Sequence, residues 1–220
     1  MKKGIGVIWL LIVVVFSSCG DKRRYHDEAK EQEVSLYPAQ IKEIVKFQQN
    51  LNKTFKDPNL SPLPDRFRKD FDGLDFFKPD TQFIVQGILK RTPNAIPFMM
   101  PTNTERFSEE TVYGIIEFRL QNKAYSLEVY QNVQLRDSIG FRDYLFLPFL
   151  DKTNGVESYE GGRYLDLSIP EGDAITLDFN KAYNPYCVYN KKYSCPIVPK
   201  ENYLNTEIKA GVKRFDKTNK

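Results

Sequence analysis

The stretch VYGIIEFRLQNKAYSLEVYQ, from Val112 to Gln131, decides the fold class of this chain. In its first half, apolar residues alternate with charged ones, Ile116, Phe118 and Leu120 with Glu117 and Arg119. A polar turn at 121–123 follows, and a second alternating run places Tyr125, Leu127 and Val129 on one face. A period of two residues is typical of a strand with one buried face, and a short polar turn between two such strands predicts a β-hairpin. The sheet is therefore expected to be antiparallel.

Other strand-like segments lie on both sides of this hairpin, at 82–90, 143–150, 163–169 and 174–179. The second of them, DYLFLPFL, is apolar on both faces, so we expect a strand that is central in the sheet. The proline-containing segment 93–104 is expected to be a loop, because proline interrupts a strand pattern.

A helix is expected before the first strand, beginning at Ser35 or Pro38 and ending before Pro58. Its apolar residues recur at spacings near three and four, which places them on one face: Tyr37, Ile41, Ile44, Val45, Leu51 and Phe55. The stretch 57–79, rich in proline and phenylalanine, is interpreted as a segment wrapped over a core. Together these patterns predict a mainly β (α+β) fold, an antiparallel β-sandwich or barrel-like sheet with the N-terminal helix packed on it.

The N-terminus has the layout of a secretory signal peptide. Lys2 and Lys3 precede the apolar run 5–16, and Ser17-Ser18-Cys19 follows it. The run is shorter than the ~20 apolar residues that span a bilayer. A cysteine after small residues resembles the bacterial lipobox, which implies cleavage before Cys19 and acylation of its sulfur and its new amino group. An ordinary signal peptide with an incidental cysteine, or an uncleaved anchor, is the alternative.

The chain thus divides into a signal peptide at 1–18, a lipidated polar tether at 19–34, a helix with an aromatic wrapped segment at 35–80, and a β-rich domain at 81–215. Two or three acyl chains anchor a protein durably where one does not. We therefore expect a domain outside the cytoplasm, held at the bacterial cell envelope by a membrane contact through its N-terminal lipid.

Charge and histidine content exclude several function classes. The formal net charge is +3, and part of it lies in the signal peptide, so nucleic acid is not an expected partner. The single histidine, His26, lies in the tether. The folded body therefore lacks an imidazole for a Ser-His-Asp or Cys-His arrangement or for a histidine zinc site. No cofactor and no metal site are expected.

Special residues crowd together in the last third of the chain. The sequence reads FLDKTNG at 149–155, YEGGRYLD at 159–166, DFNKAYNPYC at 178–187, CP at 195–196 and EN at 201–202. This pattern resembles the family known as domain of unknown function 1684, although Glu160 stands where a third glycine is usual. The resemblance supplies a sequence pattern and no reaction, because the function of that family is not established.

The candidate ligand site takes its residues from these motifs: Arg163, Asp178, Asn180, Tyr183 and Asn184. Together they could bind a small anionic or hydroxylated ligand. The alternative is structural, with Arg163 paired to a buried aspartate and the asparagines capping turns. Arg163 and Asp166 are three apart on a strand and are therefore expected on opposite faces.

Two functions follow from these residues. The leading one is a non-catalytic lipoprotein that binds a small ligand or a partner protein. The competing one is a histidine-independent hydrolase that uses Asp166 or Asp178 with Arg163 and Tyr183, since carboxylates can perform acid–base chemistry without histidine.

Cys187 and Cys195 flank a tyrosine-rich loop. In an oxidising envelope the first expectation is a disulfide that closes this loop, worth about 2.5 kcal/mol in the chain-entropy model. Free structural thiols are the next alternative. A metal pair or a nucleophilic cysteine is less favoured, because the spacing is wide and no histidine lies nearby.

Overall fold

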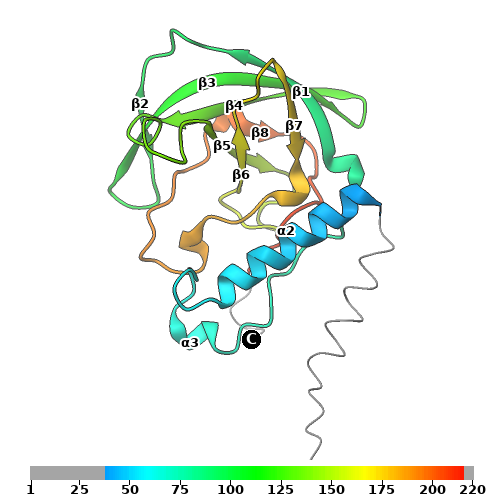
Figure 1. Cartoon of the computed structure of the whole chain (residues 1–220), viewed down its shortest axis with the longest axis vertical. Helices are drawn as coiled ribbons and strands as arrows, with labels where there is room; N and C mark the ends of the chain where they lie inside the picture. The colour runs from blue at the N-terminus through cyan, green and yellow to red at the C-terminus, as the bar shows by residue number, and fades with distance from the viewer. Residues whose placement is uncertain (1–37, 216–220) are drawn as a thin grey trace, which may run out of the picture. The chain divides into compact units, whose positions relative to one another are not determined.

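The computed structural model describes residues 38–215 (Figure 1). The predicted signal peptide, Cys19 and the tether lie outside the described residues. The chain from Pro38 onward forms one compact unit. Between residues 38 and 215, none of the helices is both long enough and apolar enough to cross a bilayer.

Helix α2 (Ala39–Lys56) is the helix expected from the apolar spacing, and Pro38 is its N-cap. It buries Ile44 and Phe55, and Lys53 and Lys56 lie in its last turn, where cations interact favourably with the helix dipole. The wrapped segment that follows contains the one-turn helix α3 (Asp65–Arg68).

The described residues also contain eight strands: β1 (Ile84–Arg91), β2 (Phe98–Pro101), β3 (Phe107–Leu120), β4 (Lys123–Asn132), β5 (Tyr144–Asp151), β6 (Arg163–Ser168), β7 (Ala174–Asp178) and β8 (Tyr203–Leu204). Short 3-10 helices lie between them: η1 (Thr81–Phe83), η2 (Phe179–Lys181), η3 (Tyr186–Val188) and η4 (Lys200–Asn202).

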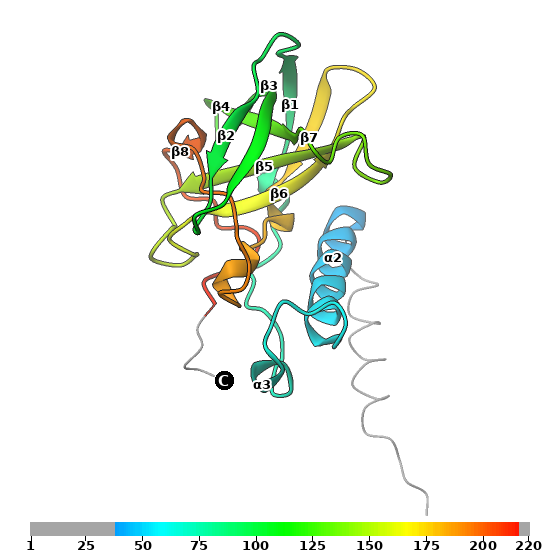
Figure 2. The ribbon, with the colours of Figure 1, turned by 90° about the vertical axis from the view of Figure 1, so that its left-hand side faces the viewer.

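The strands make one sheet in the order β6-β5-β4-β3-β1-β7, with β2 paired to β3 and β8 paired to β5. All pairs are antiparallel except β5 with β8. The sheet curls into a half-barrel, and α2 and α3 lie at one end of it (Figures 1 and 2). The mainly β, α+β prediction is confirmed, in its barrel-like form.

The hairpin predicted at 112–131 is the longest pairing of the sheet, between β3 and β4. Gln121 and Asn122 form its turn, with φ angles of 50° and 64°. Two consecutive positive φ values are the geometry of the two-residue turn whose twist matches that of the flanking strands. One prediction was wrong nearby, because residues 98–101 form β2 instead of a loop. The edge position of β2 explains this, since an edge strand tolerates proline.

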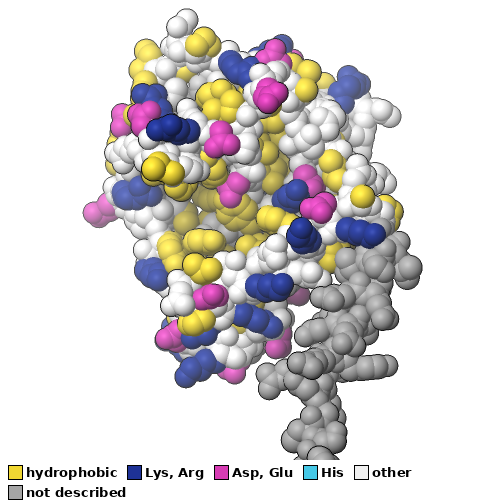
Figure 3. All heavy atoms as spheres, in the orientation of Figure 1, with side chains coloured by type: hydrophobic (Ala, Val, Ile, Leu, Met, Phe, Trp, Pro, Cys, Tyr) yellow, Lys and Arg dark blue, Asp and Glu magenta, His cyan; other side chains and the backbone are white. Residues whose placement is uncertain are grey.

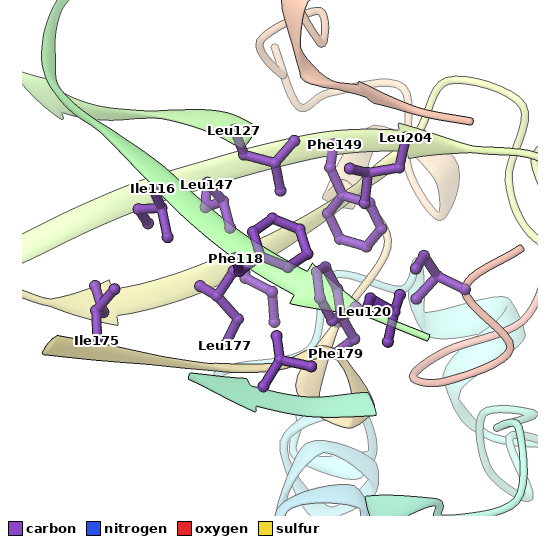
Figure 4. Close-up of a cluster of buried hydrophobic side chains, with 14 of the residues drawn as sticks. Ile116, Phe118, Leu120, Leu127, Leu147, Phe149, Ile175, Leu177, Phe179 and Leu204 are labelled. Atoms are coloured by element: carbon purple, nitrogen blue, oxygen red, sulfur yellow. The ribbon is translucent and has the colours of Figure 1, made fainter. Parts of the chain in front are cut away.

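The main core lies inside the curl of the sheet (Figure 4). Strand β5 contributes Leu145, Leu147 and Phe149 to it, while Phe146 belongs to a separate cluster with Tyr164. Alternate residues of β5 therefore point to two different apolar regions, which accounts for the strand that the sequence shows as apolar on both faces. A third cluster joins α2 to the wrapped and C-terminal segments through Phe55, Leu63, Phe71, Leu74, Tyr189 and Val212.

Candidate functional site

A pocket of about 430 Å³ lies between α2, the sheet and the segment 183–196. Phe47 and Leu51 of α2 form one wall, and Phe146 of β5 belongs to another. Hydrophobic side chains gather in the middle of this face of the molecule, with charged side chains around them (Figure 3). The volume is within the range of roughly 300–1,000 Å³ that small-molecule sites occupy.

Tyrosine dominates the lining of this pocket. Five tyrosines contribute to it, from β5, β6 and the segment that follows β7: Tyr144, Tyr164, Tyr183, Tyr186 and Tyr193. Two carboxyl groups, Glu110 and Asp166, also line it, and no lysine or arginine of the described residues does. The pocket thus combines aromatic surface with a few acidic hydrogen-bonding groups.

Glu110 is the most unusual polar residue of the pocket. It lies on β3 and is 3% exposed. Its Oε1 accepts hydrogen bonds from the Ser108 hydroxyl at 2.8 Å and from the Asn132 amide at 2.8 Å. Its Oε2 is buried and has no hydrogen-bond partner among the described residues. Burial raises the pKa of Glu110, while Asn132, Ser108 and the charge of Arg106 oppose that rise.

Asp166 lies at the exposed side of the same pocket. Its Oδ1 accepts hydrogen bonds from the hydroxyls of Tyr144, at 2.8 Å, and Tyr183, at 2.6 Å. Burial and the neighbouring Asp166 charge raise the pKa of both tyrosines. Both phenols therefore keep their protons and act as donors that hold the Asp166 carboxylate in place.

Arg163 is placed in the core instead of the pocket. Its Nη2 donates to Asp151 Oδ2 at 2.8 Å and to the carbonyl of Ile208 at 2.8 Å, and its Nη1 donates to the carbonyl of Ala210. Neither side chain of the ion pair is exposed to solvent. The structural alternative for Arg163 is thus the observed one, and the residue ties the end of β5 to the C-terminal segment.

Three other predicted site residues also have structural partners. Asn180 exchanges two hydrogen bonds of 2.9 Å with the backbone of Asp80 and is buried. Asp178 caps η2 by accepting the Asn180 N–H, and it lies 3.7 Å from the Lys181 ammonium. Asn184 is buried and donates to the carbonyl of Lys213 at 2.9 Å. None of these three residues lines the pocket that Tyr183 lines.

Strand alternation explains which residues reach the pocket. On β6, Leu165 belongs to the main core and Arg163 is buried beside it, whereas Tyr164 and Asp166 line the pocket. Arg163 and Asp166 lie on opposite faces, as their spacing predicts. Of the predicted ligand and catalytic residues, Tyr183 and Asp166 are the two that contact each other at the pocket.

The expected disulfide is not formed, because Cys187 and Cys195 are free thiols. The Cys187 backbone N–H donates to Cys195 Sγ at 3.2 Å. A hydrogen bond from the Cys187 thiol lowers the pKa of Cys195 to about 7, against the opposite effect of burial. The two sulfurs are thus placed for a thiol hydrogen bond instead of a covalent bond, and Cys195 is part of the pocket wall.

Sequence reasoning missed Glu110, because it began the predicted strand at Val112. In the structure β3 starts at Phe107, so Ser108 and Glu110 occupy alternate buried positions before the core residues of the strand. The residues FSEE at 107–110 show no apolar–polar alternation, so the sequence offered no strand signal there. An acidic side chain at an inward position of a strand is expensive to bury unless it is hydrogen-bonded, paired or neutral, so such a residue is a candidate for a functional role.

The fold and the site together define a small β-rich domain with a curled, mostly antiparallel sheet and a tyrosine-lined pocket. Residues 69–213 match the family described as "Protein of unknown function (DUF1684)". The chain belongs to this family, which confirms the resemblance found in its C-terminal motifs.

One similar solved structure is the solution NMR structure of the uncharacterized protein from gene locus rrnAC0354 of Haloarcula marismortui. It is 29% identical, covers 87% of this chain and 96% of its own chain, and superposes with a TM-score of 0.60. A search of curated proteins gives no significant match.

Proposed function

We propose that this chain is a membrane-tethered binding protein whose pocket takes a small ligand with an apolar body and one hydrogen-bonding group, a hydroxyl or an amine. The observation that carries the proposal is Oε2 of Glu110, which is buried at the pocket without a hydrogen-bond partner among the described residues. A buried polar group left unsatisfied costs about 1–3 kcal/mol. A ligand that donates to Oε2 would recover this free energy.

The lining of the pocket narrows the ligand class further. The sequence suggested a small anionic or a hydroxylated ligand. An anion would meet Glu110 and Asp166 in a lining that has no lysine or arginine among the described residues. The hydroxylated alternative fits better, because both carboxyl groups can accept hydrogen bonds. The apolar body of the ligand would pack on the tyrosine rings.

The tether belongs to the same proposal. Acylation of Cys19 would hold the domain at the bacterial cell envelope, with the polar stretch 19–34 between lipid and domain. Labelled palmitate should be incorporated into the wild-type protein and not into Cys19→Ala, which should leave the membrane fraction. A variant that stays in that fraction without label would contradict the anchor.

The pocket itself is tested by a ligand screen with two matched variants of one loop. Leu135 lines the pocket, while Ile139 is 94% exposed and does not. In a thermal-shift screen of the full-length protein against hydroxylated and amine-bearing aromatic compounds, Leu135→Trp should abolish the shifts and Ile139→Trp should keep them. Shifts that survive Leu135→Trp, or an absence of shifts in the wild-type protein, would contradict the proposal.

A second candidate function uses the same two carboxyl groups. Burial raises the pKa of Glu110, which suits a general acid, and Asp166 lines the same pocket and suits a base or nucleophile. This is the histidine-independent hydrolase in a revised form, with Glu110 in place of Arg163 and Asp178. Loss of a measured hydrolysis in both Glu110→Gln and Asp166→Asn, with ligand binding retained, would favour it.

A further inference from the structure

We propose that the ligand of this pocket is a small organic cation, an amine or a quaternary ammonium compound, held between tyrosine rings and the carboxylates of Glu110 and Asp166. This inference rests on the proposed binding function and specifies the charge of the ligand. It follows from three features of the pocket: its aromatic walls, its two acidic groups, and the unsatisfied oxygen of one of them.

The aromatic walls supply ring faces and edges from several directions. The rings of Tyr164 and Tyr183 lie edge to face at a centroid distance of 5.9 Å, and those of Tyr186 and Tyr193 do so at 5.3 Å. The face of an aromatic ring is the negative end of its quadrupole, so a ring cluster attracts cations, most strongly where water is excluded. Apolar ligands gain only burial from such a wall, whereas an ammonium group gains electrostatic attraction as well.

The two acidic groups have complementary positions for a cation. Asp166 lies at the exposed side of the pocket, where two tyrosine hydroxyls occupy its Oδ1. Glu110 is almost fully buried, with an exposed fraction of 3%. Its ionised form has lost water on burial without gaining a counter-charge in the lining. A bound cation would supply that counter-charge and stabilise the ionised carboxylate.

The cationic side chains near the pocket have other partners. Arg106 donates to the carbonyl of Ser194 at 3.0 Å, and the ammonium of Lys192 lies 4.9 Å from the centroid of the Tyr193 ring. Neither residue belongs to the lining. The Lys192 contact is a cation on the face of one of the tyrosine rings that line the pocket.

The test compares a cation with a neutral molecule of the same shape. Choline and 3,3-dimethylbutan-1-ol differ in one atom, the charged nitrogen against a carbon, and benzyltrimethylammonium adds an aromatic body. Titration calorimetry on the full-length protein should give a dissociation constant for choline about tenfold or more below that of the alcohol. Glu110→Gln should abolish this preference. Glu109→Gln is the matched control, because it removes one charge from the neighbouring position of β3, whose side chain points to the other face.

Each outcome decides the inference. Binding of both cations, with a preference for choline over the alcohol that Glu110→Gln removes and Glu109→Gln keeps, supports the inference. Equal affinity for choline and the alcohol overturns the cation inference but leaves the binding function standing. Binding of neutral hydroxylated compounds alone has the same two consequences. Failure of both cations to bind overturns the inference as well, and the screen with Leu135→Trp then decides separately whether the pocket binds anything. Circular dichroism and melting temperature of each variant identify any loss of fold.

Discussion

The guanidinium of Arg163 donates to the carboxylate of Asp151 at 2.8 Å, with both side chains fully buried. The ring centroids of Phe149 and Phe77 lie 5.3 and 5.7 Å from the guanidinium carbon, so two aromatic rings also pack near the cation. The other Asp151 oxygen accepts the backbone N–H groups of Thr153 and Ile208. This ion pair connects two strands to the C-terminal segment, and so a family motif that suggests a ligand site has a structural function.

We predict that Asp151→Asn lowers the free energy of unfolding by about 3–5 kcal/mol, because it leaves the Arg163 charge buried without a counter-charge. Urea unfolding followed by circular dichroism measures this difference. The exposed pair of Lys90 and Glu117, 60% and 51% exposed, is the control. Glu117→Gln should cost about 1 kcal/mol or less. Equal losses in the two variants would contradict the structural function of Arg163.

The backbone geometry of Gly162 leads to a second prediction about the stability of a variant. Its φ is +92°, and a Cβ there would lie 2.6 Å from Val198 Cγ2 and 2.7 Å from the Phe149 carbonyl oxygen. Gly162→Ala should therefore destabilise the protein by about 1–3 kcal/mol through backbone strain, before any cost of the close contacts. Gly172 has ordinary backbone geometry, and a Cβ added there would meet no atom within 4 Å, so Gly172→Ala should change stability by less than about 1 kcal/mol in the same measurement.

Glu110 predicts a specific pH dependence of stability. Its folded pKa is raised from the ordinary 4.5, so the folded state keeps its proton at pH values where the unfolded state has lost it. The contribution of this proton to the free energy of unfolding is therefore fully present below the pKa of Glu110 in the unfolded state. It is lost as pH rises through the pKa of Glu110 in the folded state. The positive charge of Arg106 opposes the increase in the Glu110 pKa. The Glu110 charge in turn raises the pKa of Tyr130 and Tyr144, and both tyrosines stay protonated in this pH range.

The check is the free energy of unfolding of wild-type protein and Glu110→Gln from about pH 4 to pH 8. The wild-type protein should lose stability relative to Glu110→Gln as pH rises, with the difference constant once the folded carboxyl is ionised. Glu109→Gln should leave the wild-type profile unchanged in shape. A difference between wild type and Glu110→Gln that does not vary with pH would show that burial does not shift this carboxyl.

The thiol pair predicts selective alkylation. At neutral pH Cys195 should react with iodoacetamide as its thiolate, with a rate–pH profile whose midpoint is near the lowered pKa of about 7. Cys187→Ala removes the hydrogen bond that lowers this pKa, so the midpoint should rise. Peptide mass mapping without reductant identifies each modified cysteine. A Cys187–Cys195 cross-linked peptide from native protein would contradict the free thiols.

Local patterns predicted most of the elements. The helix 39–56 follows from apolar spacing between Pro38 and Pro58, and the turn at Gln121-Asn122 follows from two alternating runs. Both depend on neighbours in sequence. Strand β2 and the first residues of β3 were missed, because each is a strand only through its pairing with the other. The composition of the region that contains β2 predicts a loop.

The alternation of side chains along each strand was determined by the sequence alone, because it is a property of the extended backbone. This alternation places Arg163 and Asp166 on opposite faces of β6. Because β5 has apolar residues at successive positions, the same alternation predicts that both of its faces are buried. The tertiary structure alone decided which face became the core and which became a pocket. Residues from α2, β3, β6 and the segment 183–196 meet there although they are far apart in the chain. The importance of Glu110 arises from this packing, since a carboxyl group is unusual only after its surroundings have excluded water.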